Sequence, residues 1–366
     1  MRIVQVAESL DFGGAERVVV DLSNALARNH DVGVICVKRV GELASQLSPD
    51  VAVKCLDKAE GLDFALPRRM AKLLREAQAD VVHIHHWGVF LEATLAASMA
   101  KVPTILHTAH GKYPNHGSGA AQSAKKALRH WMERRVSRHC KRIVCVSEAL
   151  LAYTVEEVGL KPELLQTIVN GIDVPAAFAP LPSRGGEEFV FVAVGRLAAV
   201  KNYPMMLDAF AQAAAKSSRM RLLIAGDGPE RARIEALIAE RKLASKVLML
   251  GFVKDVASVL KRADAYVISS ISEGTPMAVL EGMRAGLPVI ATRVGGLPSV
   301  IKDQETGLIV PSGDAAAMSQ AMTKLASDRA AARSMGEKAY KHVLRNFSLG
   351  SMVAAYETLY ARGSAA

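Results

Sequence analysis

The sequence predicts an α/β fold made of two doubly wound, Rossmann-like domains in tandem. Short apolar runs alternate with longer segments of helical periodicity through almost the whole chain, which is typical of parallel sheets with helices on both faces. A stretch rich in Pro, Ala and Gly at 174–186 interrupts this pattern, which restarts at residue 189. A chain of 366 residues is also long for one hydrophobic core. We therefore expect domains at 1–175 and 186–346.

The apolar runs place the strands, and the periodic segments between them place the helices. In the first domain we expect strands at 3–7, 32–37, 81–84, 104–106 and 143–146, with helices that include 15–28 and 90–100. In the second domain we expect strands at 189–194, 221–225, 247–250, 266–268, 289–291 and 307–310. Ligands of such sheets bind beyond the carboxyl ends of the strands, so two domains face to face would form an interdomain cleft.

The last segment, 347–360, predicts a helix with one apolar face. Met352, Val353, Tyr356 and Leu359 recur at helical spacing. Two interpretations remain open: a helix that packs in the core of the second domain or, from the resemblance described below, a helix at about 347–362 that crosses back onto the first domain.

Composition restricts the class of protein. The chain is 50% hydrophobic and 22% charged, as in folded globular proteins. It lacks an apolar run of the ~20 residues that a membrane span needs, and Glu8 and Asp11 come too early for a signal peptide. Its four cysteines show no CxxC spacing, which favours reduced thiols in a cytoplasmic protein.

The net charge of +10 is concentrated in one segment. Residues 112–142 contain nine Lys and Arg against Glu133, with Trp131 among apolar residues at helical spacing. Such a basic helix fits the anionic inner face of a membrane, or it is a solvated helix whose apolar side enters the core. The residues expected to face the membrane are Lys125, Lys126, Arg129, Arg134, Arg135 and Arg138. A nucleic-acid partner is not expected, because recognisable binding motifs are missing and aromatic residues make up only 5%.

Two glutamates eight positions apart, Glu273 and Glu281, are the most informative feature of the second half. An apolar strand precedes them, and a small-residue turn containing Gly274 and Thr275 leads into a helix at Met277. The backbone N–H groups of that turn would form an anion site at the helix N-terminus. Carboxylates on either side of such a site suit a ligand with hydroxyls flanking a phosphate, as in a sugar nucleotide.

Two cations follow another buried strand. Arg196 and Lys201 lie just after 189–194, where both can reach one diphosphate. Cations in this position would stabilise the negative charge of a bound diphosphate. Gly226 ends the next strand in a Gly-Asp-Gly-Pro turn, where a glycine lets backbone approach a ligand closely.

The first domain carries a glycine loop and a group of histidines. Gly13 and Gly14 lie between the first strand and the first helix, but they lack the full dinucleotide fingerprint. Glu16 would contact an acceptor hydroxyl or favour the helix N-terminus electrostatically. His85 lines the predicted cleft or packs under it, and His110 follows a strand. The histidine spacing does not favour a metal site, and the chain has no Asp-x-Asp motif for a metal-bridged diphosphate.

Together these motifs resemble the family-4 retaining glycosyltransferases, which have the GT-B fold and an E-x7-E motif, and within them the bacterial cell-envelope polysaccharide type. The resemblance covers nearly the whole chain. It implies a retaining, metal-independent hexosyltransferase that uses a nucleotide sugar, expected to be a UDP-sugar, without a further cofactor. The expected acceptor is a saccharide or lipid-linked saccharide in cell-surface polysaccharide, lipopolysaccharide or glycolipid synthesis. The resemblance also implies a cytoplasmic enzyme, peripheral on the inner face of the membrane.

The resemblance assigns roles residue by residue. Arg196 and Lys201 stabilise the departing diphosphate, Glu273 orients the donor sugar and Glu281 holds the ribose. His110 meets the donor sugar. The remaining donor-site residues implied are Gly14, Gly226, Phe252, Val253, Gly274 and Thr275, with Phe252 and Val253 at a segment whose backbone pairs with the base. Gly13, Glu16 and His85 are implied near the acceptor.

Three alternatives remain open at this point. A nucleotide-sugar epimerase on the same fold would need no acceptor. A non-catalytic GT-B scaffold would not need the intact charged motifs. In a membrane-surface binding module, the basic helix itself would be the function.

Overall fold

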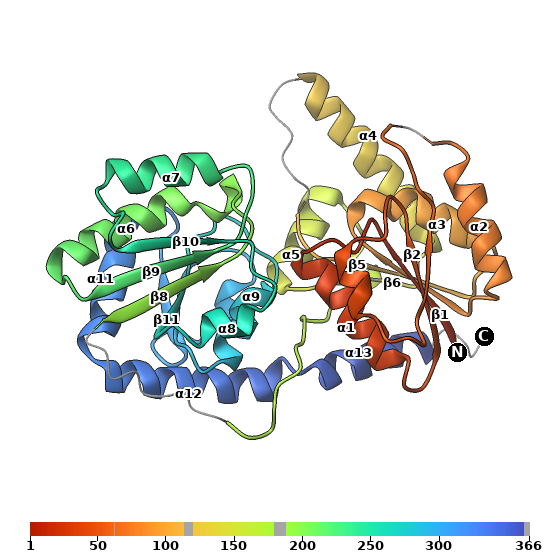
Figure 1. Cartoon of the computed structure of the whole chain (residues 1–366). Coiled ribbons are helices and arrows are strands. Elements are labelled where there is room, and N and C mark those ends of the chain that lie inside the picture. Colours follow the sequence, from red (N-terminus) through yellow and green to blue (C-terminus); the bar gives the residue numbers. More distant parts are fainter. Residues whose placement is uncertain (62, 113–119, 179–187, 362–366) are drawn as a thin grey trace. The chain divides into compact units, whose positions relative to one another are not determined.

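The computed structural model describes residues 1–61, 63–112, 120–178 and 188–361 as two compact units (Figure 1). The first unit comprises Met1–Gly171 with Leu349–Ala366, and the second comprises Ile172–Ser348. The first-domain boundary predicted at residue 175 thus lies four residues beyond the division after Gly171. Most of the predicted linker, from residue 179, lies outside the described residues.

The first unit is built on a seven-stranded parallel sheet in the order β3-β2-β1-β4-β5-β6-β7. Its strands are β1 (Arg2–Ala7), β2 (Asp31–Cys36), β3 (Ala52–Cys55), β4 (Val81–His85), β5 (Thr104–Ala109), β6 (Arg142–Cys145) and β7 (Leu165–Thr167). Its main helices are α1 (Gly14–Leu26), α2 (Leu66–Glu76), α3 (Phe90–Met99), α4 (Ala120–Val136) and α5 (Glu148–Tyr153). The central strands are buried along their length, because helices cover both faces.

The second unit repeats the architecture with a six-stranded parallel sheet in the order β10-β9-β8-β11-β12-β13. Its strands are β8 (Phe189–Val194), β9 (Met220–Ala225), β10 (Val247–Gly251), β11 (Ala265–Ile268), β12 (Val289–Thr292) and β13 (Gly307–Val310). Its helices are α6 (Tyr203–Lys216), α7 (Arg231–Glu240), α8 (Val256–Leu260), α9 (Met277–Arg284), α10 (Leu297–Val300), α11 (Ala315–Ser327) and α12 (Arg329–Asn346).

The predicted α/β class and two parallel doubly wound sheets are confirmed, and each predicted strand is present within a few residues. Sequence analysis missed β3 and β7. β3 lies at the sheet edge, where its residues are alternately exposed and half-buried, and β7 has only three residues. Neither offers the apolar run by which buried strands are found.

The last helix, α13 (Leu349–Ala361), packs in the first unit, where it contacts α1. Met352, Tyr356 and Leu359 are buried as predicted, and Tyr360 is buried with them. Of the two interpretations of this segment, the structure supports the helix that returns to the first unit. No helix in the described ranges is long and apolar enough to cross a bilayer. All four cysteines are free thiols, three of them buried.

Candidate active site

The strand order of the second unit identifies a topological switch point between β8 and β11. From β8 the chain moves outward through β9 to β10, then returns to lay β11 on the other side of β8. The segments that follow β8 and β11 therefore diverge at the carboxyl edge of the sheet, which is where such folds bind ligands. Lys201 follows β8, and Glu273 follows β11.

The structure brings these two predicted residues into contact. Lys201 Nζ lies 2.5 Å from Glu273 Oε1, although the residues are 72 positions apart. The Ser270 hydroxyl donates to the same oxygen at 2.5 Å. Both charged side chains are largely shielded from water, with 22% of Lys201 and 10% of Glu273 exposed. Lys201 and Glu273 thus form a largely buried ion pair at the switch point.

The loops that carry this pair are tied to each other. Ser269 Oγ donates to the carbonyl oxygens of Lys201 and Asn202 at 2.7 and 3.0 Å. Thr292 Oγ1, at the end of β12, donates to the Ser270 carbonyl at 2.6 Å. Sequence analysis did not identify the buried residues Ser269 and Ser270 as part of the site. The signal that could have identified them is their position directly after the apolar strand β11.

Glycines let the neighbouring loops pack closely. Gly226 has φ +150°, and a Cβ there would lie 1.9 Å from the Gly195 carbonyl oxygen. Gly295 has φ +52°, and a Cβ there would lie 1.8 Å from the Glu273 carbonyl oxygen. We expected the glycine at 226 to admit a ligand. The structure shows that it admits the backbone of the Arg196 loop, which is a sufficient reason for glycine at that position.

The other predicted donor residues lie on the same edge. Arg196 is exposed beyond β8, and it forms no ion pair within the described part of the chain. Phe252 follows β10 with 47% of its surface exposed, and Val253 is next to it. Gly274 and Thr275 precede α9, whose fifth residue is Glu281, so this glutamate lies just over one helical turn from the start of α9.

In the first unit, His110 is the last member of a hydrogen-bond chain that begins with the buried side chains of Gln5 and His85. His85, on β4, is fully buried, and its Nδ1 lies 3.0 Å from His110 Nε2. The opposite nitrogen of His85 lies 2.7 Å from Gln5 Oε1, on β1. Burial lowers the pKa of both His85 and His110 well below the ordinary value, so both rings are neutral near pH 7. His85 therefore packs under the surface, which is the second of the two expected positions, and its implied place near the acceptor stays a prediction.

A second branch of buried polar groups joins the histidines to α13. His83 lies 2.8 Å from the Tyr360 hydroxyl and 2.7 Å from Thr108 Oγ1, and Thr108 in turn contacts the Tyr356 hydroxyl at 3.0 Å. Desolvation lowers the pKa of His83 to about 3. Hydrogen bonds within the buried interior thus account for both ring nitrogens of His83 and of His85. Within the described residues, no group of three His, Cys, Asp or Glu side chains is arranged to hold a metal ion.

In the first unit, the carboxylate of Glu16 lies against the glycine loop formed by Gly13 and Gly14. A Cβ on Gly13 would lie 2.1 Å from Glu16 Oε2, so the Glu16 side chain folds back over the first turn of α1. The other oxygen, Glu16 Oε1, lies 3.4 Å from His86 Nε2. This position favours the electrostatic role of Glu16 at the helix N-terminus. Gly14 is the exposed first residue of α1.

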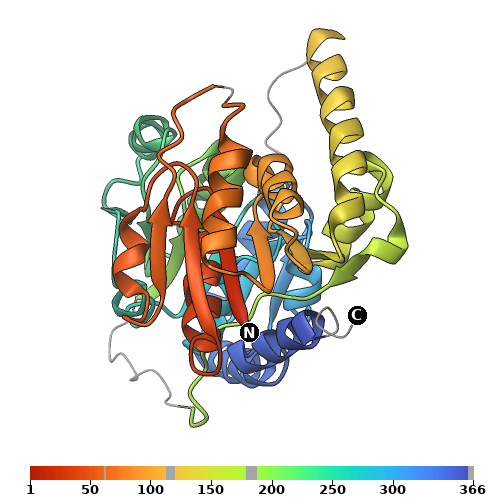
Figure 2. The ribbon, with the colours of Figure 1, turned by 90° about the vertical axis from the view of Figure 1, so that its right-hand side faces the viewer.

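The basic helix divides into two faces. Lys126 pairs with Glu157, Arg129 with the buried Glu133, and Arg134 donates to the Val158 carbonyl. Leu128 and Trp131 are instead 58% and 56% exposed, so these two apolar side chains do not enter the core of the unit. Their face also carries Lys125, Arg135 and, beyond the helix, Arg138, all exposed. The first turns of α4 extend past the sheet and the other helices of this unit (Figure 2).

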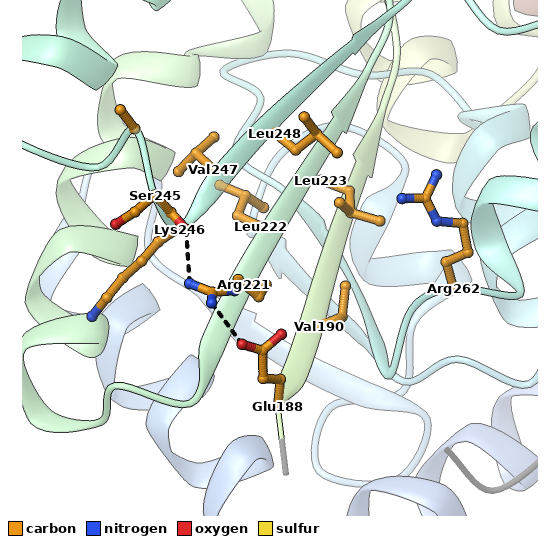
Figure 3. Close-up of a pocket in the computed structure, with 11 residues that line it drawn as sticks. Glu188, Val190, Arg221, Leu222, Leu223, Ser245, Lys246, Val247, Leu248 and Arg262 are labelled. Carbon is orange, nitrogen blue, oxygen red and sulfur yellow. Dashed lines mark hydrogen bonds and ion pairs between the residues drawn. The ribbon is translucent and has the colours of Figure 1, made fainter. Parts of the chain in front are cut away.

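A pocket of about 580 Å³ lies at the opposite edge of the second sheet (Figure 3). Val190, Leu223 and Leu248 line it near the amino ends of β8, β9 and β10. Its most central charged residue, Arg221, is bound by Glu188 and the Ser245 carbonyl. Because Arg221 is already paired with Glu188 and the pocket is remote from the switch point, we do not assign the donor to this pocket.

Comparison with known proteins agrees with the class that the fold and the switch-point charges define, a GT-B glycosyltransferase. The structure of Anabaena Alr3699/HepE in complex with UDP-glucose superposes with a TM-score of 0.81, at 18% identity over 98% of this chain and 99% of that one. This likeness shows the fold.

Sequence comparison identifies the family. The family profile described as Glycosyltransferase Family 4 matches residues 12–175, and that described as Glycosyl transferases group 1 matches residues 179–342. The chain belongs to glycosyltransferase family 4. It is 29% identical to N-acetyl-alpha-D-glucosaminyl L-malate synthase of Bacillus anthracis, over 81% of this chain and 78% of the relative. It is 26% identical to UDP-Gal:alpha-D-GlcNAc-diphosphoundecaprenol alpha-1,3-galactosyltransferase of Escherichia coli, over 95% and 93%.

Proposed function

We propose that this glycosyltransferase moves a hexose from a UDP-sugar to a hydroxyl of a saccharide or lipid-linked saccharide in cell-envelope polysaccharide or glycolipid synthesis. The Lys201–Glu273 pair at the switch point carries the proposal, because it offers one cation and one carboxylate to a single ligand. The choice of UDP is supported by the UDP-Gal in the name of the Escherichia coli relative and by the UDP-glucose bound to the Anabaena protein. The lipid-linked acceptor is supported by the diphosphoundecaprenol in the former name.

In this proposal the second unit binds the donor. The diphosphate lies against Arg196 and Lys201, which stabilise the negative charge that develops as the glycosidic bond breaks. Glu273 Oε1 is occupied by Lys201 and Ser270, while its other oxygen accepts no hydrogen bond from the described residues. That second oxygen is available to orient a sugar hydroxyl. Glu281 holds the ribose, and His110 of the first unit contributes a hydrogen bond to the donor sugar.

Retention of anomeric configuration and independence of metal belong to the same proposal. The cationic side chains Arg196 and Lys201 would take the place that a divalent ion has in metal-dependent transferases. Transfer should therefore proceed in EDTA, and the product should keep the anomeric configuration of the donor.

The proposal is tested by following label from a panel of UDP-sugars into lipid-linked saccharides, in EDTA, with the product's anomeric configuration read by NMR. Label in the acceptor fraction with retained configuration supports the proposal. Interconversion of UDP-sugars without any transfer would identify an epimerase instead. Nucleotide binding without transfer or interconversion would identify the protein as a non-catalytic scaffold.

An anionic membrane surface is the expected location of the reaction, on the cytoplasmic side. The outward face of α4 supports this, because Trp131 and Leu128 can enter the interface while Lys125, Arg135 and Arg138 meet lipid phosphates. The L-malate in the name of the Bacillus anthracis relative supports testing a small acid as acceptor as well.

We expect Leu128→Ser/Trp131→Ser to reduce binding to phosphatidylglycerol vesicles by about tenfold or more, from the lost apolar burial. Arg135→Gln should reduce it by about fivefold, since one basic residue near an anionic surface contributes about 1 kcal/mol. Lys126→Gln is the matched control, because it removes the same charge from a side chain already paired with Glu157. Vesicle co-sedimentation measures all three, and equal binding by every variant would show that this face does not contact the membrane.

A further inference from the structure

The hydrogen bonds under His110 determine which of its nitrogens carries the proton. Gln5 and His85 are both fully buried, and the Gln5 carbonyl-type oxygen, which can only accept, lies 2.7 Å from His85 Nε2. His85 Nε2 must therefore hold the hydrogen. A neutral imidazole has one N–H, so His85 Nδ1 presents a lone pair.

The same reasoning continues to His110. Its Nε2 lies 3.0 Å from that lone pair on His85, so Nε2 is the donor. The charged groups around the His110 ring do not change this assignment. His86 lies with its ring centroid 5.4 Å away, and the carboxylate of Glu16 is beside His86 rather than His110. The neutral ring of His110 is left with a lone pair at Nδ1.

His110 Nδ1 is shielded from solvent and has no hydrogen-bond partner among the described residues. Buried polar atoms are paired in most proteins, and His110 directly follows β5, at the carboxyl edge where such sheets bind ligands, so Nδ1 is placed to accept a hydrogen bond from a ligand. A group that pairs with this lone pair must donate a hydrogen, as a sugar hydroxyl does and a carboxylate does not.

We propose that Gln5 and His85 are positioning residues that hold His110 in its Nε2–H tautomer, so that His110 accepts a hydrogen bond from a sugar hydroxyl at Nδ1. The tautomer follows from the two distances and from the orientation of the Gln5 amide, whose oxygen faces His85. The assignment of the partner as a hydroxyl of the donor sugar rests on the proposed function.

The tautomer is read directly from the ¹⁵N shifts of histidine-labelled protein, with the His110 signals assigned by their loss in His110→Ala. We expect wild-type His110 to be protonated at Nε2. Gln5→Glu keeps an acceptor against His85 and should keep this tautomer, whereas Gln5→Leu should give a mixture of the two. Thr108→Val removes a hydrogen bond of equal burial from the His83 branch, and it should leave the His110 signals unchanged. A wild-type His110 protonated at Nδ1, or charged at pH 7, would overturn the proposal.

Kinetics test the consequence for transfer. In Gln5→Leu we expect about a tenfold lower kcat, the order of one lost hydrogen bond, with the KM for the donor little changed and activity restored in Gln5→Glu. A loss of stability alone would lower the active fraction without changing the tautomer, and the NMR arm separates the two. If no UDP-sugar supports transfer, the proposed function fails while the tautomer assignment is still decided. If Gln5→Leu does not fold, the wild-type and Gln5→Glu spectra decide it.

Discussion

Replacing Lys201 with alanine is expected to lower kcat by about 10²–10³-fold, the usual cost of removing one group that stabilises transition-state charge. Lys201 is the cation at the switch point, and its contact with Glu273 places both groups at one position on the ligand. The effect should fall on kcat, because charge on the diphosphate grows as its bond to the sugar breaks.

Lys201→Ala should lower the free energy of unfolding by less than it raises the activation free energy, for which a 10²–10³-fold loss of kcat corresponds to about 2.7–4 kcal/mol. Without Lys201, the Glu273 carboxylate keeps the Ser270 hydroxyl and is 10% exposed, so the loss in unfolding free energy should be about 1–3 kcal/mol. Lys341→Ala removes a lysine from an exposed pair with Glu337 in the same unit, and it serves as the control for both measurements. Steady-state kinetics and urea unfolding separate the two effects. A Lys201→Ala enzyme with normal turnover would remove the central residue of the proposed mechanism.

Gly226→Ala is expected to destabilise the second unit by about 3 kcal/mol or more, through overpacking combined with an unfavourable φ. The added methyl would lie 1.9 Å from the Gly195 carbonyl oxygen, and backbone at that position cannot move as a flexible side chain can. The loop that carries Arg196 would have to shift, so nucleotide binding should weaken together with stability.

Gly313→Ala separates strain from steric clash. Gly313 has φ +81°, but a Cβ there would meet no atom within 4 Å. It should lose only the ~1–3 kcal/mol of a left-handed non-glycine residue and keep nucleotide binding. Thermal unfolding and UDP titration of the two variants provide the comparison. Equal losses in both would show that the close approach of the Gly195 and Gly226 loops is unimportant.

The sequence was sufficient for the strands other than β3 and β7, and for the charged motifs that follow them. Arg196, Lys201, Glu273 and Gly226 were located because parallel strands end at one edge of a sheet, and this rule needs only strand positions. Fold class followed from the same alternation of segments.

Contacts between distant side chains could not be predicted. Nothing in the periodicity indicates that Lys201 meets Glu273, or that Gln5 lies beneath His85, because these contacts depend on strand order and rotamers. Sequence analysis also gave the apolar residues of α4 to the core or to a membrane without deciding. The helix buries Glu133 and His130 and exposes Trp131, so hydrophobicity alone does not indicate which face of α4 is internal.

The proposed donor site is tested most directly by following the thermal stability of the purified protein against UDP, GDP and ADP, each in the presence of EDTA. We expect UDP to raise Tm, on the order of 5 °C at about 100-fold excess over Kd, and Arg196→Ala and Glu281→Ala to lose the shift. GDP and ADP should give smaller shifts. A wild-type protein that no nucleotide stabilises, or whose UDP shift survives in both variants, would contradict the assignment of the donor site.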